Sequence, residues 1–226
     1  PPAEPSPLQR RLTALTGKTS SFQKWWTASV SRQGAELVGR MQTKLIYATM
    51  SPYESALAAS LLSQQTGIPW VADLRDPWAL DDMEIFACFI QKRRRLRQMH
   101  DWLQSASAIV MNTPEATGAL VEAFPDFASK RVVTITNGYD VQDFAGAVAP
   151  RQDGKFRIVH CGFFQTDMGR RIRRRRWMYR CLGGMSREVD VLTRSHVFLM
   201  RAIDSWCTAH PERKQDIEIV FVGSRS

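Results

Sequence analysis

The sequence predicts an α/β fold: a Rossmann-like parallel sheet with helices on both faces, followed by the start of a second α/β domain. Two observations predict it. In the first half, four short runs of β-compatible residues alternate with helical patterns, as in parallel sheets joined by crossover helices. Beyond Phe144 the composition shifts, and a strand, helix, strand pattern begins again. The 44% hydrophobic and 23% charged residues are typical of a globular protein, so we expect a packed core.

The elements of the first half follow from apolar periodicity and from the residues that end or begin each segment. Ser51-Pro52 interrupts the first strand, Gly67 ends the following helix, and Pro114 suits the first turn of another. The expected helices are Pro7–Leu15, Phe22–Met41, Glu54–Gln65, roughly 82–105 and Pro114–Ala123, and the expected strands are Lys44–Thr49, Pro69–Leu74, Ala108–Met111 and Arg131–Ile135.

The second half is expected to be a smaller α/β unit. Its strands are Phe156–His160 and Ile217–Val222, and its main helix is Ser195–Ala209. We expect a first domain over 1–144, a linker over 145–154 and a second domain over 155–226. Two strands and one helix leave much apolar surface uncovered, so we expect this second domain to be incomplete and the chain to be a piece of a longer protein.

Polar residues follow each of the four strands of the first half. The carboxyl ends of the strands fall at Thr49–Ser51, Asp73–Asp76, Asn112–Thr113 and Thr136–Gly138. Carboxyl ends of parallel strands open on one edge of a sheet, where ligands bind in α/β proteins. We therefore predict a cleft that includes Ser51, Arg75, Thr113, Asn137 and Gly138. The alternative is a solvated surface loop in which Arg75 pairs with an acidic neighbour.

The net charge of +9 is concentrated in two clusters, Lys92–Arg97 and Arg170–Arg176. Such clusters suit nucleic acid phosphates, anionic lipid headgroups or the diphosphate of a small ligand. The first lies in a predicted amphipathic helix and is read as a solvated outer face. The second directly precedes Trp177, and basic residues beside aromatic ones suit a membrane interface, although an ordinary exposed helix is the alternative. Its arginines are Arg170, Arg171, Arg173, Arg174, Arg175 and Arg176.

Several classes of protein are disfavoured. The four cysteines and four histidines show no spacing typical of metal or redox sites, so we expect no metal and reduced thiols in a cytoplasm. The sequence has neither a run of about 18 apolar residues, as a membrane span needs, nor the apolar core of a signal peptide. No G-x-G-x-x-G motif follows a strand, which argues against a dinucleotide-dependent enzyme.

Three segments resemble successive landmarks of family-4 glycosyltransferases of the GT-B fold. They are Ile68–Trp78, Ile135–Asp140 with Phe144 behind it, and Val159–Phe164. Their order is similar to the second part of that family's N-terminal domain, the crossover and the opening of the C-terminal domain. The resemblance implies a hexosyltransferase-like enzyme that transfers a sugar, with retention of configuration, from a nucleotide-sugar donor to a sugar or lipid-linked acceptor. The nucleotide-sugar is a substrate, so no cofactor is implied.

The resemblance also implies roles for individual residues. Arg75 falls where many relatives carry a histidine near the reacting sugar, and Asp76 falls on the acidic residue beside it, so these two are the catalytic candidates. Gly162 matches the loop that approaches the donor diphosphate, and Arg194 lies near a cation that offsets its charge. Asn137 and Gly138 match the turn at the crossover, where glycine permits a positive φ and the domains can hinge.

The chain departs from the family pattern in two respects. An arginine-rich insertion lies between Phe164 and Arg194, where relatives usually have a short loop. The family's first strand with its Gly-rich loop and its C-terminal acidic pair are absent, so we expect the isolated chain to be inactive. The competing hypothesis is a basic module that binds anionic membrane or nucleic acid through its arginines. Of these two partners the inner face of the membrane is preferred, with the protein peripheral to it.

Overall fold

The computed structural model describes residue 6 and residues 20–146, 151–186 and 188–223. These residues form two compact units. Unit 1 is the chain up to Gly138 together with Leu182–Met185, and unit 2 is Tyr139–Cys181 with the chain from Ser186 onward. The division thus precedes the boundary expected after Phe144, and the membership of Leu182–Met185 in unit 1 was not predicted. The helix expected at Pro7–Leu15 and part of the expected linker lie outside the described residues.

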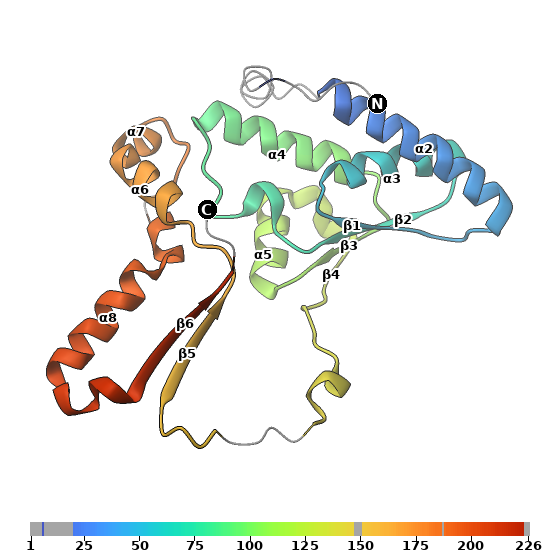
Figure 1. The fold of residues 1–226 in the computed structure, drawn as a ribbon. Coiled ribbons are helices and arrows are strands. Elements are labelled where there is room, and N and C mark those ends of the chain that lie inside the picture. The colour runs from blue at the N-terminus through green and yellow to red at the C-terminus, as the bar shows by residue number, and fades with distance from the viewer. Residues whose placement is uncertain (1–5, 7–19, 147–150, 187, 224–226) are drawn as a thin grey trace. The chain divides into compact units, whose positions relative to one another are not determined.

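Unit 1 is built on a four-stranded parallel sheet (Figure 1). Its strands lie in sequence order: β1 (Ile46–Met50), β2 (Trp70–Leu74), β3 (Ala108–Met111) and β4 (Arg131–Thr134). The register aligns Thr49 with Asp73, and Asp73 with Val110. All four carboxyl ends therefore lie at the same edge of the sheet, as the sequence predicted.

The helices of unit 1 begin and end at residues suited to these positions. Ser20 and Gln23 form a capping box at the start of α2, and the left-handed Gly67 ends α3. The Thr113 hydroxyl accepts a hydrogen bond of 3.1 Å from the Ala116 N–H and caps α5. Among its described residues, the helices are α2 (Ser21–Met41), α3 (Glu54–Thr66), α4 (Phe89–Leu103) and α5 (Pro114–Ala123). Their existence and order confirm the prediction.

One hydrophobic core lies on a single face of this sheet. Alternate residues of β2 and β3, such as Trp70, Leu74 and Ile109, pack there with Leu103 of α4 and Leu120 of α5. Crossovers of one hand between strands in sequence order place every connecting helix on the same face. The opposite face of the sheet, which we call the open face, carries the exposed Tyr47. The expectation of helices on both faces is therefore wrong for the described residues.

Helix α4 begins at Phe89 and not near residue 82 as expected. The Asp81 carboxylate accepts a hydrogen bond of 2.9 Å from the Met83 N–H, which turns the chain. The Phe86 N–H then donates to the Gly184 carbonyl oxygen at 2.9 Å. This segment thus binds the returning 182–185 segment, a long-range contact that local apolar spacing does not reveal.

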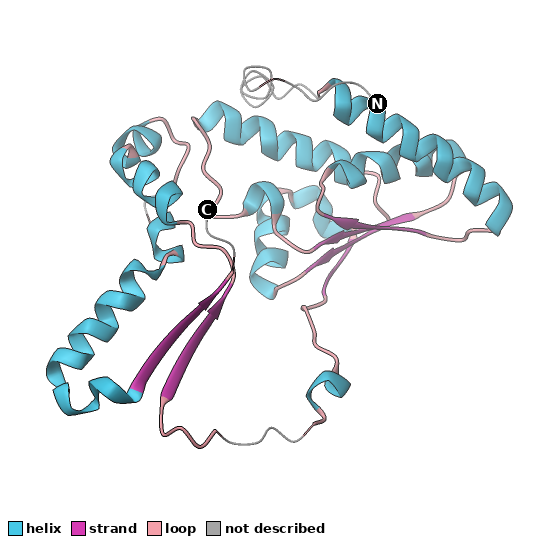
Figure 2. Ribbon diagram, in the orientation of Figure 1, coloured by secondary structure: helices cyan, strands magenta, loops and turns pink. Residues whose placement is uncertain are grey.

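The described part of unit 2 contains a two-stranded parallel sheet of its own, drawn as magenta arrows in Figure 2. They are β5 (Phe156–Cys161) and β6 (Ile217–Val222). Between them lie α6 (Thr166–Arg174), α7 (Arg176–Cys181), the 3-10 turn Val191–Arg194 and α8 (His196–Ala209). Strands β5 and β6 and helix α8 confirm the prediction. The two short helices form the arginine-rich insertion, for which an exposed helix had been one of the alternatives.

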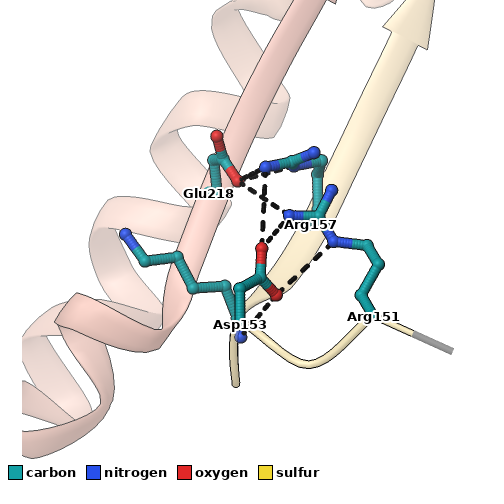
Figure 3. Close-up of polar contacts among 5 residues, drawn as sticks. Arg151, Asp153, Arg157 and Glu218 are labelled. Atoms are coloured by element: carbon teal, nitrogen blue, oxygen red, sulfur yellow. Dashed lines mark hydrogen bonds and ion pairs between the residues drawn. The ribbon is translucent and has the colours of Figure 1, made fainter.

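A group of ion pairs joins the two strands of unit 2 at their amino ends (Figure 3). Arg157 of β5 lies opposite Glu218 of β6 in the register, and the two side chains form an ion pair. Asp153 pairs with Arg151 and lies 3.8 Å from Arg157. These partly exposed pairs favour the observed register and contribute little to stability.

Candidate functional site

An open depression of about 350 Å³ lies at the carboxyl ends of the four strands of unit 1. Every strand contributes to it, either from its last residues or from the loop that follows. The lining residues are Tyr47, Thr49, Asp73, Arg75, Val110, Asn112, Ile135, Thr136, Asn137 and Gly138. The sequence therefore predicted the convergence of the four strand ends, which this depression confirms.

The floor of the depression is the open face of the sheet. Thr49, Asp73 and Val110 are neighbours in the strand register, and each lies one residue away from a core position. Tyr47 lies two residues before Thr49 on the same face. A hydrogen bond to the Asp73 carboxylate raises the pKa of Tyr47, with burial as a smaller cause, so its phenol stays protonated and donates.

The rim of the depression carries an exposed cation. Arg75 is exposed, and among the described residues no carboxylate lies within ion-pairing distance of its guanidinium. The alternative in which Arg75 pairs with an acidic neighbour is therefore wrong. The Asn112 amide donates a hydrogen bond of 2.6 Å to the Arg75 carbonyl oxygen and holds this loop. Its own carbonyl oxygen, Oδ1, is buried and without a partner among the described residues.

A cluster of aromatic residues anchors the loop that carries Arg75. Trp78 is buried, adopts φ +54°, and stacks on Tyr53 with ring centroids 4.6 Å apart. The Arg95 guanidinium lies over the Trp78 ring at 5.6 Å. Burial, reinforced by the nearby Asp76 carboxylate, raises the pKa of Tyr53 to about 12, so this phenol remains neutral. These contacts give the loop after β2 a rigid base.

The structure separates the predicted residues of unit 1 into two groups. Arg75, Asn137 and Gly138 line the depression. The other three, Ser51, Asp76 and Thr113, do not line it. The Thr113 hydroxyl is used as a helix cap, and Ser51 and Asp76 are exposed beside the strand ends. Gly138 does not have the positive φ expected at the crossover, and a β-carbon there would meet nothing within 4 Å. The positive φ that the resemblance implied for Gly138 is therefore not found.

Sequence reasoning missed Tyr47 and Val110, because their place depends on which face of the sheet is covered. Asp73, Asn112 and Thr136 lay inside the predicted strand ends but were not singled out. The signal for the strand residues was alternation, because Tyr47, Thr49 and Asp73 alternate with the apolar core residues of β1 and β2. Once the core face is known, the same alternation identifies the residues on the opposite face.

In unit 2, Gly162 and Arg194 lie on two segments joined by a hydrogen bond. Gly162 follows β5 with φ +143°, a conformation that favours glycine, and its N–H donates to the Val222 carbonyl oxygen at 3.0 Å. The Gln165 N–H donates to the Arg194 carbonyl oxygen at 3.3 Å. The exposed Arg194 immediately precedes Ser195, which caps α8. The loop after β5 therefore lies beside the amino terminus of α8.

Four aromatic side chains support this loop. Phe164 stacks on His160 at 4.5 Å between ring centroids and meets His196 and Phe221 edge-on, at 5.0 Å each. Nδ1 of His196 lies 3.4 Å from the Thr166 hydroxyl. The two histidines thus pack against the aromatic rings of this loop.

Three further findings bear on function. Among the described residues, no group of three or more histidine, cysteine, aspartate or glutamate side chains is placed to hold a metal ion. Within that same part of the chain, every helix is too short or too polar to cross a lipid bilayer. No protein-family model matches the sequence, and a comparison with curated proteins finds no match either.

Proposed function

We propose that this chain belongs to a glycosyltransferase that moves a sugar from a nucleotide-sugar to an acceptor hydroxyl with retention of configuration. Unit 1 would bind the acceptor and unit 2 the donor. The observation that carries the proposal is the depression in which four strand ends of unit 1 bring a cation, a carboxylate, hydroxyls and amides together. The resemblance of three segments to family-4 glycosyltransferases supports the choice of chemistry.

The chemistry of the depression suits a polyhydroxylated acceptor. Asp73 accepts hydrogen bonds from sugar hydroxyls, and Asn112 and Asn137 supply amides that donate and accept. Arg75 donates to a hydroxyl or phosphate oxygen, in place of the histidine expected from the resemblance. Such a set recognises hydroxyl groups without a metal ion. Asp76, which lies outside the depression, would act only by its negative charge.

The donor side of the proposal rests on Gly162, Arg194 and the amino terminus of α8. A helix N-terminus and a glycine loop favour a bound diphosphate. In the transfer, the bond between the sugar anomeric carbon and the diphosphate oxygen breaks, and its electron pair leaves with the diphosphate. The acceptor oxygen bonds to the same carbon, and its proton passes to the leaving phosphate. Arg194 would offset the negative charge that develops there.

The first test measures donor binding by the 226-residue chain. Isothermal titration with the diphosphates of uridine, guanosine and adenosine, and with their glucose conjugates, should identify one nucleotide with a measurable affinity. Arg194→Ala should weaken that affinity about tenfold or more. Arg201→Ala, which removes an exposed arginine of the nearby helix α8, is the matched control and should leave the affinity unchanged.

The second test measures transfer by the protein expressed from its complete reading frame. Arg194→Ala should lower kcat far more than Arg201→Ala does, and proton NMR of the product should show a retained anomeric configuration. Absence of nucleotide-sugar binding and of transfer would contradict the proposal. If vesicles or RNA were still bound, the alternative of a basic binding module would replace it.

A further inference from the structure

We propose that helices α6 and α7 of unit 2 form a docking surface for an anionic lipid membrane. This surface, which we call the basic face, consists of Arg170, Arg171, Arg174 and Arg175 together with Met168 and Trp177. The inference does not depend on the proposed sugar transfer, because none of these residues belongs to the depression, the loop after β5 or the start of α8.

The orientation of α6 is set by one glycine. Gly169 is buried against the turn Val191–Arg194, so closely that a β-carbon there would lie 2.8 Å from the Leu192 Cα. Residues one, two and five positions later lie away from this contact on a helix of 3.6 residues per turn. Arg170, Arg171 and Arg174 accordingly are exposed. The packing of α6 thus turns its cations outward.

Acidic side chains of the described residues leave most of the charge of the basic face without a partner. Of the six arginines from Arg170 to Arg176, only Arg173 has an acidic partner among the described residues, with its Nε 4.0 Å from Asp190. The exposed Asp167 in the first turn of α6 is the one carboxylate within these two helices. Several closely spaced cations without partners repel one another and are stabilised by an external anionic surface.

Apolar side chains lie beside these cations. Trp177 of α7 is 71% exposed and Met168 of α6 is 40% exposed. An indole ring favours the boundary between headgroups and acyl chains, and arginines beside it reach the phosphates. A nucleic acid backbone would use the arginines but would gain less from an exposed thioether and an exposed indole. The combination favours a lipid surface.

The experiment measures binding of the 226-residue chain to sedimented vesicles. Vesicles with about one third phosphatidylglycerol should bind the chain, and pure phosphatidylcholine vesicles should not. Binding should weaken steeply as salt is raised. The triple variant Arg171→Gln, Arg174→Gln, Arg175→Gln should lower the partition coefficient roughly a hundredfold, about fivefold for each arginine. Trp177→Ala should lower it several-fold.

A matched control separates this surface from net charge. Lys92→Gln, Arg93→Gln and Arg97→Gln remove the same charge from exposed positions of α4. This control triple should retain most of the vesicle affinity, and circular dichroism should show that both triples are folded. Equal losses in the two triples, or no binding to anionic vesicles at low salt, would overturn the proposal. So would a stronger affinity for single-stranded RNA that is indifferent to Trp177→Ala.

Discussion

The two units of this chain differ in how their sheets are covered. In unit 1, Trp70 and Leu74 of β2 are fully buried, and so is Leu103 of α4, which packs against them. In unit 2, Phe156 of β5 is 69% exposed, Val222 of β6 is 52% exposed, and α8 has no fully buried residue. The buried residues of unit 2 gather around the turn Val191–Arg194. Within the described residues, a continuous core therefore supports the sheet of unit 1 and not that of unit 2.

This difference in packing indicates which unit can hold a preorganised site. The depression of unit 1 stands on strands whose other face is a packed core, so its polar groups are held in fixed positions. The loop after β5 depends instead on a few aromatic contacts and on backbone hydrogen bonds from Gly162 to Val222 and from Gln165 to Arg194. We therefore expect unit 1 to unfold at higher denaturant concentration than unit 2.

The substitution with the greatest expected cost removes packing from the core of unit 1. Leu103→Ala removes a fully buried side chain and should lower the free energy of unfolding by about 2–5 kcal/mol. Leu199→Ala, the same change at a partly exposed position of α8, should cost about 1 kcal/mol or less. Hydrogen exchange resolved by unit, combined with urea unfolding, measures both. Equal costs would show that the two units are equally well packed.

The next effect concerns the segment that returns to unit 1. A β-carbon at Gly184 would lie 2.1 Å from the Phe86 carbonyl oxygen, so Gly184→Ala must displace backbone. We expect it to destabilise unit 1 by about 1–3 kcal/mol. Gly39→Ala in α2 meets nothing within 4 Å and should stabilise by about 0.5–1 kcal/mol. Thermal unfolding of both variants tests this pair, and a neutral Gly184→Ala would show that the 182–185 segment is not docked.

A smaller effect distinguishes a helix cap from a ligand contact. Thr113→Ala removes the cap of α5 and should cost about 1 kcal/mol, whereas Thr113→Ser should restore most of that stability. Neither variant should change ligand binding once the protein is folded. If Thr113→Ala abolished binding while leaving the unfolding free energy unchanged, Thr113 would belong to the site after all.

The smallest effect is the pH dependence of unit 1. A hydrogen bond from His100 to Asp126, 2.9 Å long, raises the pKa of His100 and lowers that of Asp126. The contribution of His100 to the free energy of unfolding is complete below its unfolded pKa of about 6.5. It is lost as pH rises through the higher folded pKa. The contribution of Asp126 is present above about pH 4 and is lost as pH falls through its lower folded value. The pair thus stabilises most between these limits.

Melting temperatures from pH 5 to 8.5 measure this contribution. His100→Gln and Asp126→Asn should each remove the loss of stability above about pH 6.5. Asp101→Asn, at the weaker 3.4 Å contact, should change the profile less. A profile identical in all four proteins would mean that the pair is not formed in solution.

Local patterns predicted most of the fold of unit 1. The bounds of β3 and α5 follow from an apolar run, a capping threonine and a proline, all within about a dozen residues. The start of α4 could not be predicted in this way, because the Phe86 N–H binds Gly184, far along the chain. Coverage of one face only was also hidden, since strand order is set by long-range pairing and not by the sequence of any one strand.

The candidate site was predictable in its location and less so in its members. Polar residues after each strand indicated the common edge, and Arg75, Asn137 and Gly138 lie there. Asp73 and Tyr47 become visible only after the open face is known, because each is one member of an alternating strand. Conversely, Thr113 resembles a site residue in the sequence, but its hydroxyl is used by the backbone of α5.

An NMR titration tests whether the four strand ends of unit 1 form one site for a hydroxyl-rich ligand. Nitrogen-15 spectra of the chain should be recorded while glucosides and galactosides are added. We predict shifts that cluster at Thr49, Arg75, Asn112, Asn137 and Gly138, and that Asp73→Ala diminishes. Shifts confined to other surfaces, or absent for every glycoside at millimolar concentration, would contradict the claim.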